Sequence, residues 1–267
     1  MDALVVVFLS CIALGAFIGF MAGLLGIGGG IIAVPVLLYL LPSVGVTEAH
    51  LTHVAIATSL AAIILTSISS ARAHHRRGNI PWHLFKVMLP GLALGAVSAG
   101  FIAQQIASQQ LKQAFAVFVI LMAIQMVFPF KPAKQDKPMP APIVMFTVAA
   151  AIAIIAALMG IGGGILLVPF LTWCGLQMRQ CIGFSAATGF LVALFGSVSY
   201  VIAGWQITDL PAGTLGYVYL PALIGIVSTS MLVAPIGAKA ASHLPTAHLK
   251  KVFAVLLIVT GLKLVFS

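Results

Sequence analysis

The chain has 267 residues, of which 62% are hydrophobic and only 6% are charged, and its mean hydropathy is +1.20. Because a soluble domain is about 25% charged, this composition excludes a soluble enzyme and predicts a multi-pass protein of the inner (plasma) membrane, surrounded by lipid. The formal net charge of +9 comes from basic residues scattered among short connections, so it indicates membrane topology and no nucleic-acid partner.

Ten apolar segments follow one another along the chain, and most are long enough to cross about 30 Å of hydrocarbon as a helix. The second segment of each half is the exception, since about 11 residues span only about 16 Å as a helix. The segments lie at 3–25, 31–41, 51–71, 84–104, 111–130, 142–159, 165–174, 181–203, 215–238 and 250–266.

A linker rich in proline and charge, residues 131–141, divides the segments into five and five. The two halves end alike, with AFAVFVILMAIQMV in one and VFAVLLIVTGLKLV in the other, which indicates a duplicated unit. Because each half has an odd number of segments, the second is expected to lie upside down in the membrane. The predicted fold class is an all-α integral membrane protein with inverted repeats at 1–130 and 142–267.

The distribution of lysine and arginine predicts the orientation, because short cytoplasmic loops carry the excess of positive charge. A cytoplasmic loop at residues 72–83 places the linker and the 239–251 connection on the same side. All of the 13 lysines and arginines except Lys112 and Lys263 then lie inside. Both termini are expected to be external.

The same glycine cluster follows the first segment of each half. GIGGGIIAVP, residues 26–35, matches GIGGGILLVP, residues 160–169. Three successive glycines weaken a helix by about 1 kcal/mol each relative to alanine, and the proline cannot donate a helical hydrogen bond. We therefore expect broken helices or re-entrant hairpins, with unwound glycines and a half-helix that starts between Ile31 and Pro35.

Broken backbone at membrane depth is tolerated where it is buried or lines a cavity. The freed N–H groups and the positive end of a half-helix favour an anion. All four carboxylates, Asp2, Glu48, Asp136 and Asp209, fall in expected loops or termini, so the interior lacks a counter-charge for a cation. For other glycines, namely Gly15, Gly19, Gly23, Gly91 and Gly95, close helix packing is the preferred interpretation.

Hydroxyl donors recur in the third segment of each half. Thr58 and Ser69 correspond to Thr188 and Ser199, whereas Ser59 corresponds to Gly189. Such hydroxyls either contact substrate or bond to helix backbones, and both interpretations stay open. His53 is either structural or a proton relay. The candidate substrate-binding residues are Gly28, Gly29, Gly30, Thr58, Ser59, Ser69, Gly162, Gly163, Gly164, Thr188 and Ser199.

The doubled GIGGG motif, the ATSL of residues 57–60 and the basic HHRRGNI of residues 74–80 resemble the sulfite exporter TauE/SafE family of membrane permeases. The resemblance covers essentially the whole chain. It implies a secondary transporter that moves a small sulfur-containing oxyanion, such as sulfite, sulfoacetate or another organosulfonate, with export as the expected direction. The second half departs from the first where SAATG stands in place of IATSL.

Three alternatives stay open: a transporter or channel for another small anion or for a neutral or cationic solute, a cysteine-dependent sulfur carrier, and an accessory membrane subunit. Cys11, Cys174 and Cys181 have no C-x-x-C spacing. No metal-ligand cluster, nucleotide loop or catalytic triad stands out, so neither an enzyme nor a cofactor is expected. The sequence leaves the coupling ion and the oligomeric state open, a homo-oligomer included.

Overall fold

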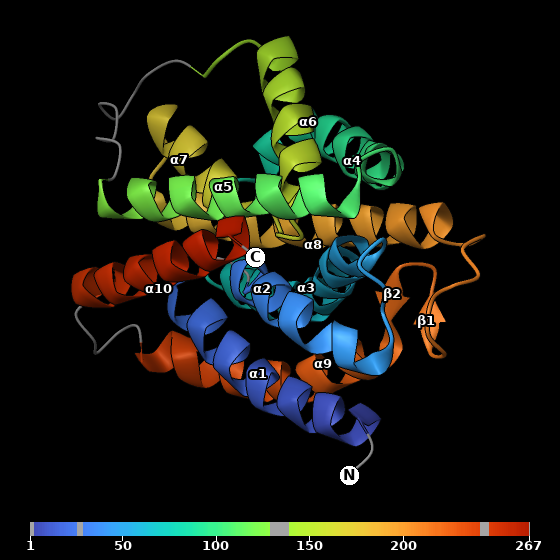
Figure 1. Ribbon diagram of the computed structural model, residues 1–267. Helices are drawn as coiled ribbons and strands as arrows, with labels where there is room; N and C mark the ends of the chain where they lie inside the picture. Colours follow the sequence, from blue (N-terminus) through green and yellow to red (C-terminus); the bar gives the residue numbers. More distant parts are fainter. Residues whose placement is uncertain (1–2, 26–28, 129–138, 241–245, 267) are drawn as a thin grey trace.

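The computed structural model describes residues 3–25, 29–128, 139–240 and 246–266, and within them the protein is all-α apart from one short hairpin (Figure 1). A 3-10 turn, Leu41–Val44, follows α2. The elements are α1 Ala3–Leu25, α2 Gly30–Leu40, α3 Leu51–Arg76, α4 Trp82–Gln104, α5 Ser108–Val127, α6 Pro142–Leu158, α7 Gly164–Trp173, α8 Met178–Ala203, β1 Thr214–Leu215, β2 Val218–Tyr219, α9 Leu220–Ala240 and α10 Thr246–Phe266.

Six of these helices, α1, α3, α4, α5, α8 and α9, contain a stretch long and apolar enough to cross a membrane in the part of the chain that the structure describes. A helix is the natural form for such a stretch, because it satisfies its own backbone hydrogen bonds without water. Each of the ten predicted apolar segments overlaps a helix of the structure, and the fold class of an all-α membrane protein is confirmed.

Helices from the two halves pack against each other (Figure 1). α1 packs along α9, α6 along α4, and α5 along α10, while α3 and α8 pair at the centre. When each helix of the first half is matched to its counterpart in the second, the pair α1–α9 corresponds to the pair α6–α4. The pairs α5–α10 and α3–α8 each correspond to themselves. This pairing is the one that a two-fold relation between repeats would produce, and the inversion itself stays a prediction.

Small residues allow the outer pairs to approach closely. A Cβ atom at Gly15 would meet the backbone carbonyl of Ile226 on α9, and one at Gly91 would meet that of Phe146 on α6. Gly19 and Gly95 are enclosed in the same way by α9 and α6, respectively. The packing interpretation is therefore confirmed for these four glycines, whereas the side-chain position of Gly23 lies outside the described residues.

Two boundaries differ most from the sequence-based expectation, by five residues each. α3 continues to Arg76, five residues past the expected end at residue 71, so the start of the expected loop is helical. Positive side chains in a last helical turn interact favourably with the exposed carbonyls. The segment expected at 215–238 begins instead with β1 and β2, which pair antiparallel, and α9 starts only at Leu220. The 131–141 linker lies largely outside the described residues.

Candidate functional site

The two short helices begin in the same unusual way. Gly29 precedes α2 with φ 74° and ψ −18°, and Gly163 precedes α7 with φ 77° and ψ −11°. This left-handed conformation costs glycine little, because glycine lacks a Cβ. Each helix starts directly after this residue, earlier than the window between Ile31 and Pro35 that the sequence suggested, and the proline lies inside the helix. Gly28, one of the candidates, lies outside the described residues.

The two glycine motifs meet in space although they are far apart in sequence. A Cβ atom at Gly30 would meet the carbonyl oxygen of Gly160 and would lie 3.2 Å from Cα of Ile161. From α3, the hydroxyl of Ser59 donates a 2.8 Å hydrogen bond to that same carbonyl of Gly160. We call this place, where the start of α2 meets residues 160–164 beside α3 and α8, the glycine crossing.

The second motif leaves backbone donors unused at the glycine crossing. Leu166 and Leu167 both donate to the carbonyl of Gly163. The preceding N–H groups, those of residues 162–165, find no acceptor among the described residues. The first turn of a helix has such groups by construction, and together with the helix dipole they attract negative charge. This arrangement suits an oxyanion better than a cation.

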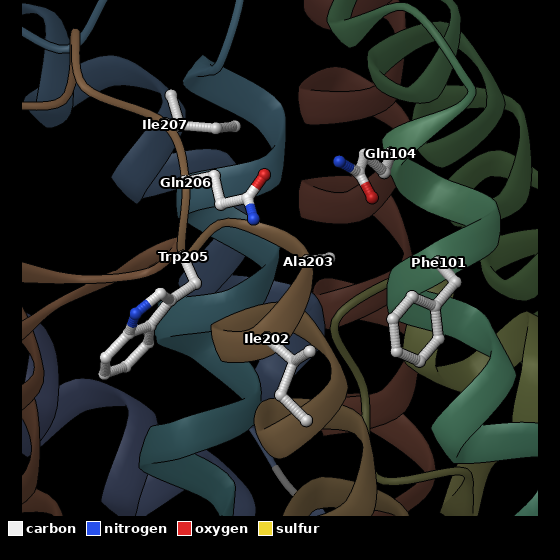
Figure 2. A pocket seen from close by; sticks show the side chains of 7 residues that line it. All are labelled: Phe101, Gln104, Ile202, Ala203, Trp205, Gln206 and Ile207. Carbon is white, nitrogen blue, oxygen red and sulfur yellow. The ribbon is translucent and has the colours of Figure 1, made fainter.

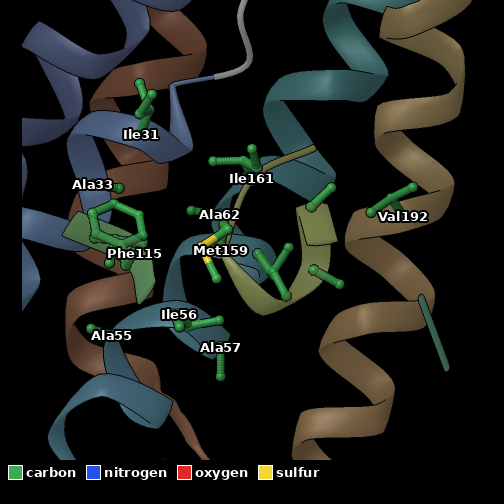
Figure 3. Close-up of a cluster of buried hydrophobic side chains, with 14 of the residues drawn as sticks. Ile31, Ala33, Ala55, Ile56, Ala57, Ala62, Phe115, Met159, Ile161 and Val192 are labelled. Carbon is green, nitrogen blue, oxygen red and sulfur yellow. The ribbon is translucent and has the colours of Figure 1, made fainter. Parts of the chain in front are cut away.

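The apolar lining of the glycine crossing comes from both halves of the chain (Figure 3). Ile31 of α2, Ala62 of α3 and Val192 of α8 are buried together with Met159 and Ile161. An environment of this kind strengthens any electrostatic interaction inside it, because the local dielectric is low.

The threonine pair has different partners in the two halves. Thr58 is fully buried, and its Oγ1 accepts a 3.0 Å hydrogen bond from the backbone N–H of Tyr219. Thr188, equally buried, donates from Oγ1 to the carbonyl of Phe184, 2.9 Å away in its own helix. In this conformation both threonine side chains are therefore engaged by the protein.

The serine pair also differs between the halves. Ser199 donates to the carbonyls of Gly196 and Ala96 at 2.8 and 3.2 Å and accepts from the N–H of Gly100 at 3.1 Å. Its contacts join α8 to α4. Ser69 is half-buried on α3. The structure thus brings Gly29, Gly30, Ser59 and Gly162–Gly164 to the glycine crossing and gives Ser199 a helix-packing contact.

Two further serines were not among the candidates chosen from the sequence. Ser67 and Ser197 are 7% and 5% exposed, and Oγ of Ser197 is buried without a hydrogen-bond partner in the described part of the chain. Oγ of Ser67 would lie 3.5 Å from a Cβ at Gly189, which itself borders Gly162. The spacing that pairs Thr58 with Thr188 also pairs Ser67 with Ser197, so the repeat alignment contained a signal for them.

The acidic side chains near the ends of the described helices are few. Glu48 is exposed in the connection before α3, and Asp209 lies in the connection after α8, with Oδ1 3.3 Å from Nε2 of His50. The described spans contain no carboxylate. The three cysteines are buried, and no disulfide joins them in the described part of the chain.

A cavity of about 460 Å³ lies between the ends of α4 and α8 (Figure 2). Gln104 of α4 and Gln206, just after α8, face each other across it, while Phe101, Ile202 and Trp205 supply apolar walls. The cavity is therefore away from the glycine crossing, at the end of the bundle where α3 begins and the 204–219 connection lies.

Comparisons with known proteins agree on the class of the chain. The family model described as sulfite exporter TauE/SafE matches residues 11–264. A "probable membrane transporter protein" of Haemophilus influenzae is 39% identical over 96% of this chain and 97% of its own length. Another, of Methanocaldococcus jannaschii, is 27% identical over 94% and 92%, respectively. No solved structure matches at a significant level.

Proposed function

The chain belongs to the sulfite exporter TauE/SafE family, and from this premise we propose that it is a secondary transporter that exports a small sulfur-containing oxyanion. Sulfite, sulfoacetate and other organosulfonates are the substrate class that we infer. Membership of a membrane permease family and relatives named as probable membrane transporters support transport itself. The choice of an anion depends on the physical chemistry of the glycine crossing.

The observation that carries the choice is the row of N–H groups at residues 162–165 without an acceptor among the described residues. A tetrahedral or pyramidal oxyanion accepts several hydrogen bonds at once, and hydrogen bonds to a charged acceptor are about twice as strong as neutral ones. The hydroxyls of Ser67 and Ser197 would add donors from α3 and α8. A cation at the same place would lie at the positive end of the α7 helix dipole, which disfavours it.

The glycine crossing is closed in this conformation, because Gly30 packs directly on the backbone of Gly160 and Ile161. The proposal therefore requires a second conformation in which α2 and residues 160–164 separate. Alternation of this kind is the general mechanism of transporters whose substrate lies between repeats.

The decisive experiment is flux through the purified full chain in liposomes. We expect counterflow of sulfite or sulfoacetate and no flux of sodium or of an uncharged solute. Replacing both Ser67 and Ser197 with alanine should reduce anion flux, whereas Ser228→Ala, which removes a hydroxyl bonded within its own helix, should not. Flux of sodium or of the uncharged solute without anion flux would overturn the proposal. A membrane vesicle assay in both orientations then decides export or import.

A cysteine-free variant distinguishes an anion permease from a cysteine-dependent sulfur carrier. Replacing Cys11, Cys174 and Cys181 with alanine should leave anion flux intact, because the thiols are buried and a reactive thiol needs exposure and a stabilised thiolate. Loss of flux in a well-folded cysteine-free protein would favour the cysteine-dependent sulfur carrier.

A further inference from the structure

A group of ionisable side chains gathers where α3 begins, at the end of the bundle that is external in the predicted topology. His50 and His53 lie at the start of α3, Tyr200 lies near the end of α8, and Asp209 and Tyr217 come from the 204–219 connection. Nε2 of His50 is 3.3 Å from Oδ1 of Asp209, and the rings of His53 and Tyr217 stack with centroids 5.1 Å apart. We call these five residues the histidine–tyrosine cluster.

The hydrogen bonding of His53 determines which ring nitrogen carries the proton. His53 is 3% exposed, and its Nε2 lies 2.9 Å from the carbonyl oxygen of Ala103 on α4. A carbonyl only accepts, so Nε2 must carry the hydrogen, and Nδ1 of the neutral ring then presents a lone pair. Nδ1 is buried and has no hydrogen-bond partner among the described residues. His53 thus holds an unused base inside the bundle.

A second unsatisfied group also lies near Tyr217. The hydroxyl of Tyr200 is buried without a partner in the described part of the chain, and the rings of Tyr200 and Tyr217 are 6.3 Å apart. Burial and the charge of Asp209 raise the pKa of Tyr217 above its usual value, so Tyr217 stays neutral at physiological pH. Buried polar atoms without partners are costly, and a pair of them around one tyrosine needs a functional explanation.

We propose that Nδ1 of His53 is a proton-binding site that couples anion transport to proton movement; this inference rests on the proposed function. A proton leaves a hydronium ion in the aqueous phase, and a new N–H bond forms at Nδ1, which leaves water and an imidazolium ion. His50 and Asp209, which are partly exposed, connect the site to solution. The cation at His53 compensates the charge of an anion in an interior without carboxylates.

Few other charges face this site. On α8 and the 204–219 connection they are the groups of the histidine–tyrosine cluster itself, and on α4 the backbone carbonyl of Ala103 is the partner. α5 packs against the start of α3 through a hydrogen bond from Thr52 to Ser108. Lys112, one turn further, is the sole ionisable side chain on that helix. No carboxylate other than Asp209 is present among these described elements, so protonation of His53 changes the local charge strongly.

The cluster is also connected mechanically to the glycine crossing. Tyr217 stacks on His53, and two residues later the N–H of Tyr219 donates to Thr58. Thr58 directly precedes Ser59, which bonds to Gly160. A charge that appears at His53 therefore acts on a segment anchored beside the proposed anion site.

The first test measures proton binding without any substrate. Nitrogen-15 NMR of histidine in the full chain should show one histidine that is Nε2–H when neutral and gains a proton at Nδ1 on acidification, and this signal should be absent in His53→Gln. A His53 that stays neutral from about pH 5 to about pH 8, the range over which histidines ordinarily titrate, would overturn the proposal. This result is independent of whether the cargo is a sulfur oxyanion.

The second test measures coupling in liposomes with sulfoacetate, whose sulfonate carries no proton near neutral pH. In the wild type an imposed pH gradient should drive net sulfoacetate flux, and sulfoacetate should move protons. His53→Gln should lose both effects but keep sulfoacetate exchange at equal pH, and His83→Gln, a change at an exposed histidine of α4, should behave as wild type. Gradient-driven flux that persists in His53→Gln would refute the coupling role, whereas absence of all anion exchange in the wild type would refute the proposed function.

Discussion

The hydroxyl of Ser59 donates a 2.8 Å hydrogen bond to the carbonyl oxygen of Gly160, which lies 101 residues further along the chain. This bond joins α3 of the first half to the unwound glycines of the second. It satisfies a carbonyl that the break between α6 and α7 leaves outside the helical ladder. The contact therefore makes the glycine crossing a joint between the halves as well as a candidate binding site.

Removing this hydroxyl should destabilise the protein. In Ser59→Ala the buried carbonyl of Gly160 loses its partner, which costs about 1–3 kcal/mol of unfolding free energy. Thermal unfolding in detergent measures the change. Thr260→Ala is the control, because its exposed hydroxyl bonds within its own helix and its loss should change the melting temperature little. Equal melting temperatures for both variants and the wild type would show that the Ser59–Gly160 hydrogen bond does not stabilise the contact between the two halves.

Two glycines of the crossing should respond differently to alanine. Gly30→Ala places a methyl group against backbone atoms of Gly160 and Ile161, which cannot move away, so the loss of stability should reach about 1–3 kcal/mol as in overpacked cores. In Gly162→Ala the new Cβ would lie 3.2 Å from the Ile63 Cγ2 methyl and 3.4 Å from Cα of Gly189. A side-chain methyl can adjust, so this variant should fold.

Gly162→Ala then tests the binding site itself. The added methyl group would cover the N–H groups of residues 162–165, so calorimetry with sulfite should show weaker binding than in the wild type. Ser228→Ala is again the control with a small change away from the crossing. If well-folded Gly162→Ala binds sulfite with wild-type affinity, the second glycine motif serves helix packing and not anion binding.

The matched threonines Thr58 and Thr188 should differ on mutation. Thr58→Ala leaves the buried N–H of Tyr219 without an acceptor, so residues 214–219 should exchange amide hydrogens faster and the protein should lose about 1–3 kcal/mol. Thr188→Ala removes a bond within its own helix and should lose less. Hydrogen exchange followed by mass spectrometry compares them. Faster exchange and a larger loss of stability in Thr188→Ala than in Thr58→Ala would show that the hairpin is not held through Thr58.

The predicted orientation can be checked at two exposed positions in a cysteine-free background. A membrane-impermeant thiol reagent should label Glu48→Cys from outside intact cells, and should label Arg77→Cys only after the cytoplasmic face is opened. Both residues are exposed, so accessibility depends on the side of the membrane. Labelling in the reverse pattern would place the termini inside.

Carboxylates outside the histidine–tyrosine cluster should be dispensable for flux. Glu48 is exposed at the end of the bundle, and the described spans carry no carboxylate, so Glu48→Gln should retain anion flux in liposomes. Asp136→Asn, in the linker, should also do so. Complete loss of flux in a well-expressed Glu48→Gln protein would indicate a cation or gating role for this side chain.

Length, hydropathy and the placement of glycines were enough to locate the helices and their breaks. Each span closes its backbone hydrogen bonds within its own residues, so length and hydropathy located α1 and α6 without knowledge of their neighbours. The breaks are equally local, because Gly29 and Gly163 adopt a conformation that other residues avoid. At Leu215, in contrast, a strand that pairs with the neighbouring β2 replaces the expected start of α9.

Which polar groups are engaged and which are unused depends on contacts between helices that lie far apart in the sequence. Ser59 bonds to Gly160, Thr58 to Tyr219 161 residues away, and Ser199 joins α8 to α4. Nδ1 of His53 and Oγ of Ser197, in contrast, are buried without partners among the described residues. A hydroxyl or imidazole carries the same chemistry in every sequence context, and its role depends on the donor or acceptor that a distant helix brings within about 3 Å.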